Sequence, residues 1–226
     1  MKFFLQAIAV VFHPLFMPLF GAWIVLNKIP FFTFSVPNSL KYLLYTLLLV
    51  VIIFQIIILA IMRRRNMISN FQISDRRERS LPIILVIFFY IFIYSLLKYR
   101  HAEFMLPDEI YGMFMGVIIS LAGAFVISFV FKLSIHMLGI CGILGVVMAL
   151  SMNYDFNHHV ENYWWINGLG LFIDVNQLSV SFLWISGLAI CAGLVGSSRI
   201  YTGNHTFTEI VTGGALGFLI NYIVMI

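Results

Sequence analysis

Residues 110–152 read IYGMFMGVIISLAGAFVISFVFKLSIHMLGICGILGVVMALSM, and this stretch decides how the chain can fold. Only Lys132 and His136 interrupt it with basic side chains. As one helix it would be about 65 Å long at a rise of about 1.5 Å per residue, whereas the hydrocarbon core of a bilayer is about 30 Å thick. The sequence therefore predicts two spans, 110–131 and 134–152, with a reversal near Lys132 that no glycine or proline marks.

The rest of the chain is equally apolar. Of its 226 residues, 62% are hydrophobic and 10% are charged, whereas soluble domains carry about 25% charged residues. Because lipid offers no hydrogen bonds to an exposed backbone, we expect an all-α polytopic bundle of six to seven transmembrane helices, folded as a single integral membrane domain over residues 1–226. The other predicted spans are 3–26, 42–62, 81–97, 178–196 and 207–226, and Pro14 and Pro18 are expected to kink the first of these.

Cysteine and glycine usage agree with this class. Cys141 and Cys191 lie inside apolar segments without a Cys-x-x-Cys motif, which argues against a disulfide framework and a zinc site. Small residues recur in the later spans, where they predict close helix packing: Gly139, Gly142, Gly145, Gly213 and Gly217. The net charge of +4 comes from basic residues beside the spans, so no nucleic-acid partner is expected.

Three polar segments lie at span boundaries: ISDRRERSLP at 73–82, KLSIH at 132–136 and SSRIYTGNHTFTE at 197–209. Counting the predicted crossings places all three on the same side of the membrane. Polar and charged groups near a bilayer are costly and mark functional sites. The sequence therefore predicts one site assembled from these three segments.

The first segment offers guanidinium groups. Asp75 and Glu78 have the spacing of a capping box, which predicts a helix start near Arg76. Arg76 and Arg79 then share one helix face, and arginine's planar fork suits phosphate oxygens. The alternative is an ordinary membrane-edge arginine cluster, as at 63–65.

The other two segments offer a helix start and two imidazoles. Ser134 is a candidate N-cap whose neighbouring amides would bind an anion, with His136 in the first turn. Glu209 lies four residues after His205, so its carboxylate can hold one imidazole nitrogen and leave the other free to attack. Each histidine could instead be a structural residue that only satisfies a neighbouring group.

The spacing around His205 resembles a signature of the type-2 phosphatidic acid phosphatase superfamily, which are membrane lipid phosphatases. Ser198-Arg199, five residues, His205, three residues and Glu209 is similar to the third signature, Ser-Arg, five residues, His, three residues, Asp. LSIH at 133–136 resembles the second, Pro-Ser-Gly-His, and RERSLP at 77–82 is a loose likeness of the first. The resemblance covers a core of about 73–226 and implies a divergent bacterial-type member.

The resemblance implies a role for each site residue. His205 would be the nucleophile that forms a phosphohistidine, Glu209 would orient it, and His136 would be the general acid. No metal or other cofactor is implied, because positive groups stabilise the developing charge. The implied partners are a phosphorylated lipid substrate and the surrounding membrane lipids. The candidate phosphate ligands are Arg199, Ser134, Arg76, Arg77, Arg79 and Lys132.

This chain departs from the signatures at several positions. Glu209 replaces the usual aspartate, Leu133 and Ile135 replace proline and glycine, and the first signature lacks its adjacent Arg-Pro. The expected activity is hydrolysis of a phosphomonoester or diphosphate lipid. A catalytically inactive lipid-phosphate binder or carrier is the alternative, and a transporter that uses intramembrane His and Arg as an ion path is a third reading.

Location and two further polar features complete the predictions. We expect a bacterial inner membrane protein. Nine Lys and Arg lie on the side of the three polar segments and four lie on the other side. This difference does not decide the orientation, because five of the nine are candidate phosphate ligands. His13, before Pro14, could line a lateral opening for lipid or bond to the kinked backbone. The loop 153–177 is expected to be interfacial, anchored by Trp164 and Trp165.

Overall fold

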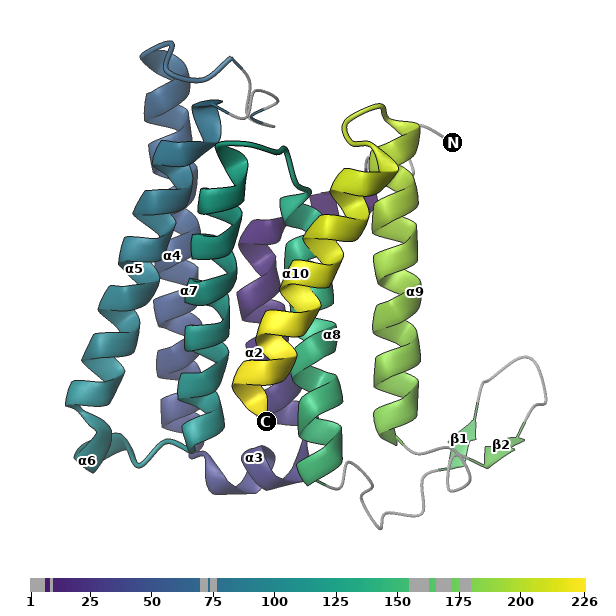
Figure 1. Cartoon of the computed structure of the whole chain (residues 1–226). Helices are drawn as coiled ribbons and strands as arrows, with labels where there is room; N and C mark the ends of the chain where they lie inside the picture. The colour runs from purple at the N-terminus through teal and green to yellow at the C-terminus, as the bar shows by residue number, and fades with distance from the viewer. Residues whose placement is uncertain are drawn as a thin grey trace.

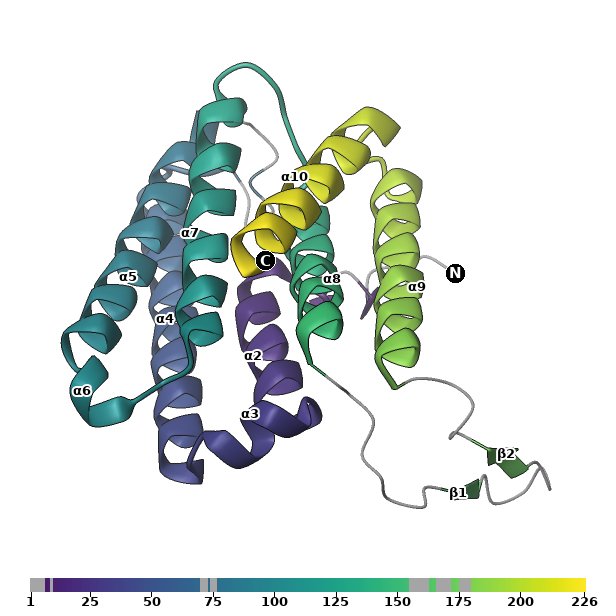
Figure 2. The ribbon, with the colours of Figure 1, turned by 60° about the horizontal axis from the view of Figure 1, so that its bottom comes forward.

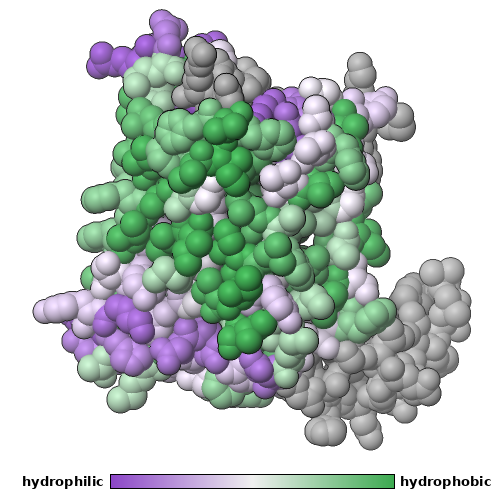
Figure 3. Space-filling view, in the orientation of Figure 1, coloured by the Kyte–Doolittle hydropathy of each residue, from purple (hydrophilic) through white to green (hydrophobic). Residues whose placement is uncertain are grey.

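A computed structural model describes residues 7–8, 10–69, 73, 77–154, 163–165, 172–174 and 180–226. Six helices in this part of the chain are long and apolar enough to cross a membrane, which confirms the all-α polytopic bundle (Figure 1). The face seen in Figure 3 is apolar across its middle and polar toward both ends. The six are α4 (Asn38–Arg64), α5 (Ser80–Tyr99), α7 (Asp108–Ser128), α8 (Ile135–Asn153), α9 (Val180–Tyr201) and α10 (Phe207–Met225).

The prediction of a first span over 3–26 is wrong, because the described residues of this run do not form a single helix. His13 caps a short 3-10 helix, η1 (Pro14–Phe16), by accepting a hydrogen bond from Leu15 N. Proline favours the first turn of a helix and breaks its interior, so α2 (Met17–Lys28) starts anew with Pro18 in its first turn. At about 18 Å, α2 is too short to span, and α3 (Pro30–Ser35) follows it.

Successive long helices run in opposite directions, so their connections alternate between the two ends of the bundle (Figure 1). The connections α4–α5, α7–α8 and α9–α10 lie at one end, as predicted for the three polar segments. We call this end the signature end. At the other end lie α6 (His101–Phe104) and a hairpin of β1 (Tyr163–Trp165) and β2 (Phe172–Asp174), which belongs to the predicted interfacial loop. Most of that loop lies outside the described residues.

The predicted reversal between 110–131 and 134–152 is confirmed, with α7 ending at Ser128 and α8 beginning at Ile135. In place of glycine or proline, other segments satisfy its polar groups. Arg79 Nη1 donates to Leu133 O at 3.0 Å, and Ser134 N donates to Glu209 O at 3.0 Å. The turn is therefore held by tertiary hydrogen bonds, which a local pattern does not contain.

Helix α8 lies at the centre of the bundle, and α10 crosses it at close range (Figures 1 and 2). A Cβ on Gly217 would lie 2.2 Å from Leu138 O, and one on Gly213 would lie 2.4 Å from Ser134 O. On α8, a Cβ on Gly145 would lie 2.5 Å from Phe218 O. These distances are shorter than van der Waals contact, so the predicted glycine packing is confirmed at this crossing.

Candidate active site

His205 and Glu209 form the centre of the candidate site. His205 Nδ1 lies 2.7 Å from Glu209 Oε2, and the His205 side chain is 2% exposed. Because an ionised carboxylate only accepts hydrogen bonds, Nδ1 carries the proton and donates a hydrogen bond to Glu209 Oε2. In neutral His205 the other ring nitrogen, Nε2, then holds a lone pair, and within the described part of the chain no hydrogen bond to Nε2 occurs.

The start of α10 positions this pair. Thr206 is the N-cap, and Thr206 and Glu209 form a capping box, in which the Thr206 side chain accepts from Glu209 N and Glu209 Oε2 accepts from Thr206 N. Such a box anchors the first helical turn. One carboxylate therefore both caps the helix and orients the imidazole, so the structural and functional interpretations of the pair hold together.

A tight turn explains why the arginine and histidine are six residues apart. At the end of α9, the carbonyl of Arg199 accepts hydrogen bonds from the amides of Asn204 and His205, at 3.1 and 3.3 Å. Gly203 has φ +69°, in the left-handed region that favours glycine. The chain thus folds back on itself and brings His205 beside the last turn of the helix that carries Arg199.

Arg199 is a buried cation in this turn. The residue is 6% exposed, and its Nε is buried without a hydrogen-bond partner among the described residues. A buried charge without a partner costs several kcal/mol. A donor held in this state points to an anionic ligand, because a guanidinium pairs with phosphate or carboxylate oxygens through its fork.

Arg79 reaches the same region from the start of α5. It is 6% exposed, and Nε donates to Ile73 O at 2.9 Å while Nη1 donates to Leu133 O. Of the three arginines proposed from the first segment, Arg76 lies outside the described residues and Arg77 has only its backbone described, in η2 (Arg77–Arg79). Glu78 accepts hydrogen bonds from Ser69 N and Oγ.

The α7–α8 connection supplies Lys132, Ser134 and His136. Lys132 Nζ donates to Asn204 O at 2.9 Å, which ties this connection to the turn before His205. Ser134 occupies the predicted N-cap of α8, but the expected side-chain cap is wrong: Oγ makes no capping hydrogen bond and is buried without a partner among the described residues. The Ser134 backbone is bonded on both sides: its carbonyl accepts from the Leu138 amide, as is usual at an N-cap, and its own amide donates to Glu209 O.

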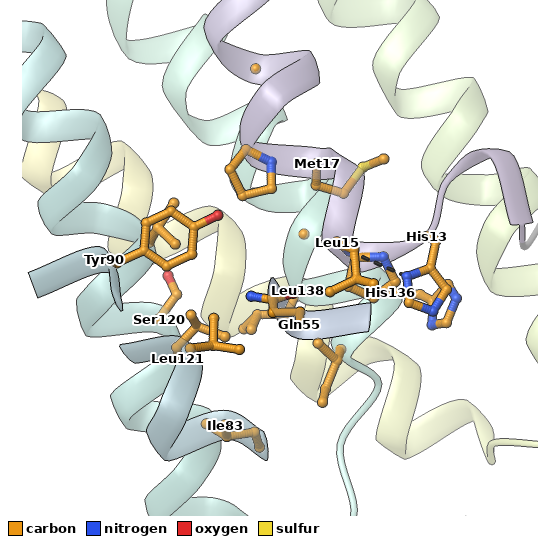
Figure 4. A pocket seen from close by; sticks show the side chains of 18 of the residues that line it. His13, Leu15, Met17, Gln55, Ile83, Tyr90, Ser120, Leu121, His136 and Leu138 are labelled. Atoms are coloured by element: carbon orange, nitrogen blue, oxygen red, sulfur yellow. Dashed lines mark hydrogen bonds between the residues drawn. The ribbon is translucent and has the colours of Figure 1, made fainter. Parts of the chain in front are cut away.

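His136 lies in the first turn of α8 against His13. The two ring centroids are 5.3 Å apart in an edge-to-face arrangement, and both rings line the main cavity (Figure 4). His13 thus bonds to backbone, as one alternative predicted, through Nδ1, and it also lines the cavity. That it borders a lateral opening for lipid stays a prediction. His13 lies outside the six spans. Its burial, and then the positive charge of Arg199, lower the pKa of His13, so its neutral form is favoured.

The cavity has a volume of about 760 Å³ and joins the site to the interior of the bundle. Arg79, Arg199, His13, His136 and His205 line it, and no aspartate or glutamate is found among its described lining residues. Most of the remaining wall is apolar side chains of α2, α4, α5, α7 and α8. The cavity is thus cationic where the signature segments meet and apolar beyond, which matches an amphiphile with an anionic head.

The electrostatics of the site favour neutral His205. Burial lowers the pKa of His205 most, and the positive charges of Arg199, Lys132 and Arg79 lower it further, against the hydrogen bond to Glu209, which raises it. A neutral imidazole is the form that can act as a nucleophile. The cations that would bind an anionic group also keep the ring unprotonated.

Most of the predicted site residues thus lie together. His205, Glu209, His136, Arg199, Arg79, Ser134 and Lys132 all lie on the three converging segments, although Ser134, Lys132 and Glu209 are not among the cavity lining. Sequence reasoning missed four polar lining residues within the spans: Gln55, Tyr90, Ser120 and Asn221. Gln55 and Asn221 gave a signal, because an amide side chain in a long apolar run is costly unless it has a role.

Comparisons with models of protein families, with curated proteins and with solved structures found no match.

Proposed function

We propose that this protein is a membrane lipid phosphatase that hydrolyses a phosphomonoester or diphosphate lipid through a phosphohistidine on His205. One observation carries the proposal: the His205–Glu209 pair and the buried Arg199, whose Nε has no partner among the described residues, meet at the cationic end of a cavity that is otherwise largely apolar. The resemblance of 198–209 to the third phosphatase signature supports the same assignment.

In the first step, His205 Nε2 attacks the phosphorus and forms a P–N bond as the bond to the lipid oxygen breaks. His136 gives its proton to the leaving oxygen, which is an alkoxide for a monoester or a phosphate for a diphosphate. Glu209 accepts the Nδ1–H hydrogen bond throughout and stabilises the ring as it gains positive charge. Arg199 and Arg79 stabilise the charge on the phosphoryl oxygens, and the site needs no metal for that task.

In the second step, water attacks the phosphorus and loses a proton to His136, the P–N bond breaks, and Nε2 regains its lone pair. The balance is one lipid phosphate and one water giving one lipid alcohol, or one lipid monophosphate, and inorganic phosphate. As further donors to the phosphoryl oxygens we assign the amides at the start of α8 and the hydroxyl of Ser134, whose Oγ has no partner among the described residues.

The test is phosphate release from a panel of lipid phosphates by the purified protein and by His205→Ala. We expect the variant to lose turnover by at least about a thousandfold while it still folds and binds the lipid. His101→Ala is the matched control, because His101 bonds to Tyr111 away from the cavity. Unchanged phosphate release by His205→Ala would refute the nucleophile assignment.

Labelled phosphate on the protein adds a direct test. Rapid quenching should trap an acid-labile phosphoryl group on wild-type protein and none on His205→Ala. His136→Ala should form and lose the intermediate slowly, because the same imidazole donates the first proton and accepts the second.

A catalytically inactive lipid-phosphate binder is the second candidate, and one observation favours it. Arg79, the described arginine of the first segment, donates two hydrogen bonds to backbone carbonyls, one of them on Leu133, where the family signature has proline. Lipid-phosphate binding that depends on Arg199, with no turnover on any lipid of the panel, would establish this candidate instead.

A further inference from the structure

A second polar cluster lies deep in the cavity. It consists of Gln55 on α4, Tyr90 on α5, Ser120 on α7 and Asn221 on α10, and we call it the deep cluster. All four residues are buried, with exposed fractions of 3 to 6%. Figure 4 shows Tyr90 and Ser120 on one side of the pocket, His13 and His136 on the other, and Gln55 between them in this view.

Half of the deep cluster has a structural explanation. Asn221 Nδ2 donates to Ser120 Oγ at 2.9 Å, and this bond links α10 to α7. The same nitrogen also donates to Gly217 O at 2.8 Å, within α10. Hydrogen bonds of this kind commonly hold transmembrane helices together. Ser120 and Asn221 would therefore be present even if nothing bound in the cavity.

Gln55 has no such explanation. It is 6% exposed and lines the cavity, and its Oε1 is buried without a hydrogen-bond partner among the described residues. An unpartnered buried amide costs about 1–3 kcal/mol, a cost that an isoleucine or leucine at this position in α4 would avoid. The terminal torsion of glutamine is broad, so the amide can turn toward a group in the cavity.

The depth of the cluster can be read from the helices. Gln55 lies nine residues before Arg64 at the end of α4, which is about 14 Å along the helix axis, near the middle of a hydrocarbon core about 30 Å thick. On α8, a Cβ on Gly142 would lie 3.0 Å from Asn221 Nδ2. Gly142 follows His136 by six residues, so Asn221 lies about 9 Å along α8 from the phosphate-binding end.

We infer that the deep cluster binds a hydroxyl group on the acyl chain of the lipid substrate. The cluster has no charged side chain, so its ligand is neutral. Gln55 Oε1 needs a donor, and a hydroxyl serves either end of the amide because it both donates and accepts. An extended chain spans about 3.5 Å per three bonds, so the roughly 9 Å between His136 and Asn221 corresponds to about eight bonds from the phosphorus. We place the hydroxyl at this level of the cavity, which Gln55 also lines. On a diacylglycerol phosphate, a hydroxyl oxygen eight bonds from the phosphorus is carried by the third carbon of the acyl chain on the neighbouring glycerol carbon.

This inference rests on the proposed phosphatase and adds a substrate class to it. A polyprenyl phosphate or a plain diacylglycerol phosphate would fill the cavity but offer Gln55 no donor. A lipid with a 3-hydroxyacyl chain would satisfy both the cationic end and the deep cluster.

The experiment compares two diacylglycerol phosphates that differ only in a hydroxyl on the third acyl carbon. For wild-type protein, we expect kcat/KM to be about tenfold higher for the hydroxylated lipid, as for one buried hydrogen bond. Gln55→Leu should reduce this ratio to about one. Ile52→Leu, a buried position on the same helix away from the cavity, should keep the wild-type ratio, and thermal unfolding should find both variants folded.

Two results would overturn the inference. Equal kcat/KM for the two lipids on wild-type protein would mean that the deep cluster only holds water or joins helices. A Gln55→Leu variant that keeps the full wild-type ratio would show that another group selects the hydroxyl. If neither lipid is hydrolysed, the proposed phosphatase fails instead, and binding of the same two lipids in nanodiscs, with the same two variants, tests the deep cluster alone.

Discussion

Helices α9 and α10 are both rich in small residues, yet they use them differently. On α10, Gly213 and Gly217 face backbone carbonyls of α8 at distances that leave no room for a Cβ. On α9, a Cβ on Gly187 or Gly193 would meet nothing within 4 Å. The crossing of α8 and α10 therefore sets the register between His136 and the His205–Glu209 pair, whereas α9 reaches the site only through its last turn, with Arg199.

Substitution at the crossing should have the largest effect. Gly217→Ala places a Cβ against the Leu138 carbonyl, and we expect it to lower the free energy of unfolding by about 3 kcal/mol. Gly193→Ala is the matched control on α9, where higher helix propensity should leave stability unchanged or raise it by up to about 1 kcal/mol. Thermal or denaturant unfolding in detergent measures both, and equal effects would remove the distinction between the two helices.

Glu209→Gln should have the next largest effect, on turnover. The amide keeps the size of the side chain but loses the charge that stabilises a positive His205, so we expect kcat to fall by roughly a hundredfold. Glu209→Asp introduces the aspartate of the signature that 198–209 resembles: in this chain the carboxylate would be one methylene short of Nδ1, and kcat should fall less. Wild-type rates in both variants would show that the pair only caps α10.

Arg199→Lys tests the contribution of α9. A lysine keeps the charge but loses the planar fork, so we expect KM for a lipid phosphate to rise about tenfold, with a smaller change in kcat. Arg63→Lys, at an exposed position on α4, is the control and should change neither. A drop in kcat alone would assign Arg199 to the transition state instead of substrate binding.

The smallest effect concerns pH. The pKa of His205 is lowered, first by burial and then by Arg199, Lys132 and Arg79, so the nucleophile stays neutral as the pH falls through the usual histidine range. Lys132→Met removes one of the positive charges and raises the pKa of His205. The acidic limb of the kcat/KM profile should then move to higher pH than in wild-type protein on the same substrate. A limb that does not move would show that another group controls it.

The sequence predicted most of the fold because an apolar run about as long as a bilayer is thick must form a helix, which satisfies its backbone hydrogen bonds within the segment. It failed at 3–26, where one span kinked at Pro14 and Pro18 was expected, whereas the chain forms the separate short helices η1 and α2. It placed the reversal near Lys132 correctly but could not explain it, because the partners of Leu133 and Ser134 lie on other helices. The tertiary hydrogen bonds that make this turn possible have no local signal.

The site was predicted in part for similar reasons. Side chains four residues apart lie side by side on a helix, so the contact between His205 and Glu209 could be expected from sequence alone. The sequence could not rank Arg76, Arg77 and Arg79, since the buried position of Arg79 depends on the carbonyls of Ile73 and Leu133 that it meets. The deep cluster comes from four helices and depends on their packing, so sequence could indicate that Gln55 was unusual but not what surrounds it.

The hydrogen bond from Ser134 N to Glu209 O has a consequence for biosynthesis. The two residues are separated by the whole of α8, the interfacial loop and α9, so the amide that begins α8 meets its acceptor only after α10 has entered the bilayer. Lys132 Nζ likewise meets its acceptor, Asn204 O, only after α9 has been made. A nascent chain that has inserted the first five of these six helices would therefore have the cavity wall of α4, α5 and α7 but not the His205–Glu209 pair, and we expect the proposed activity to begin only when the last helix docks.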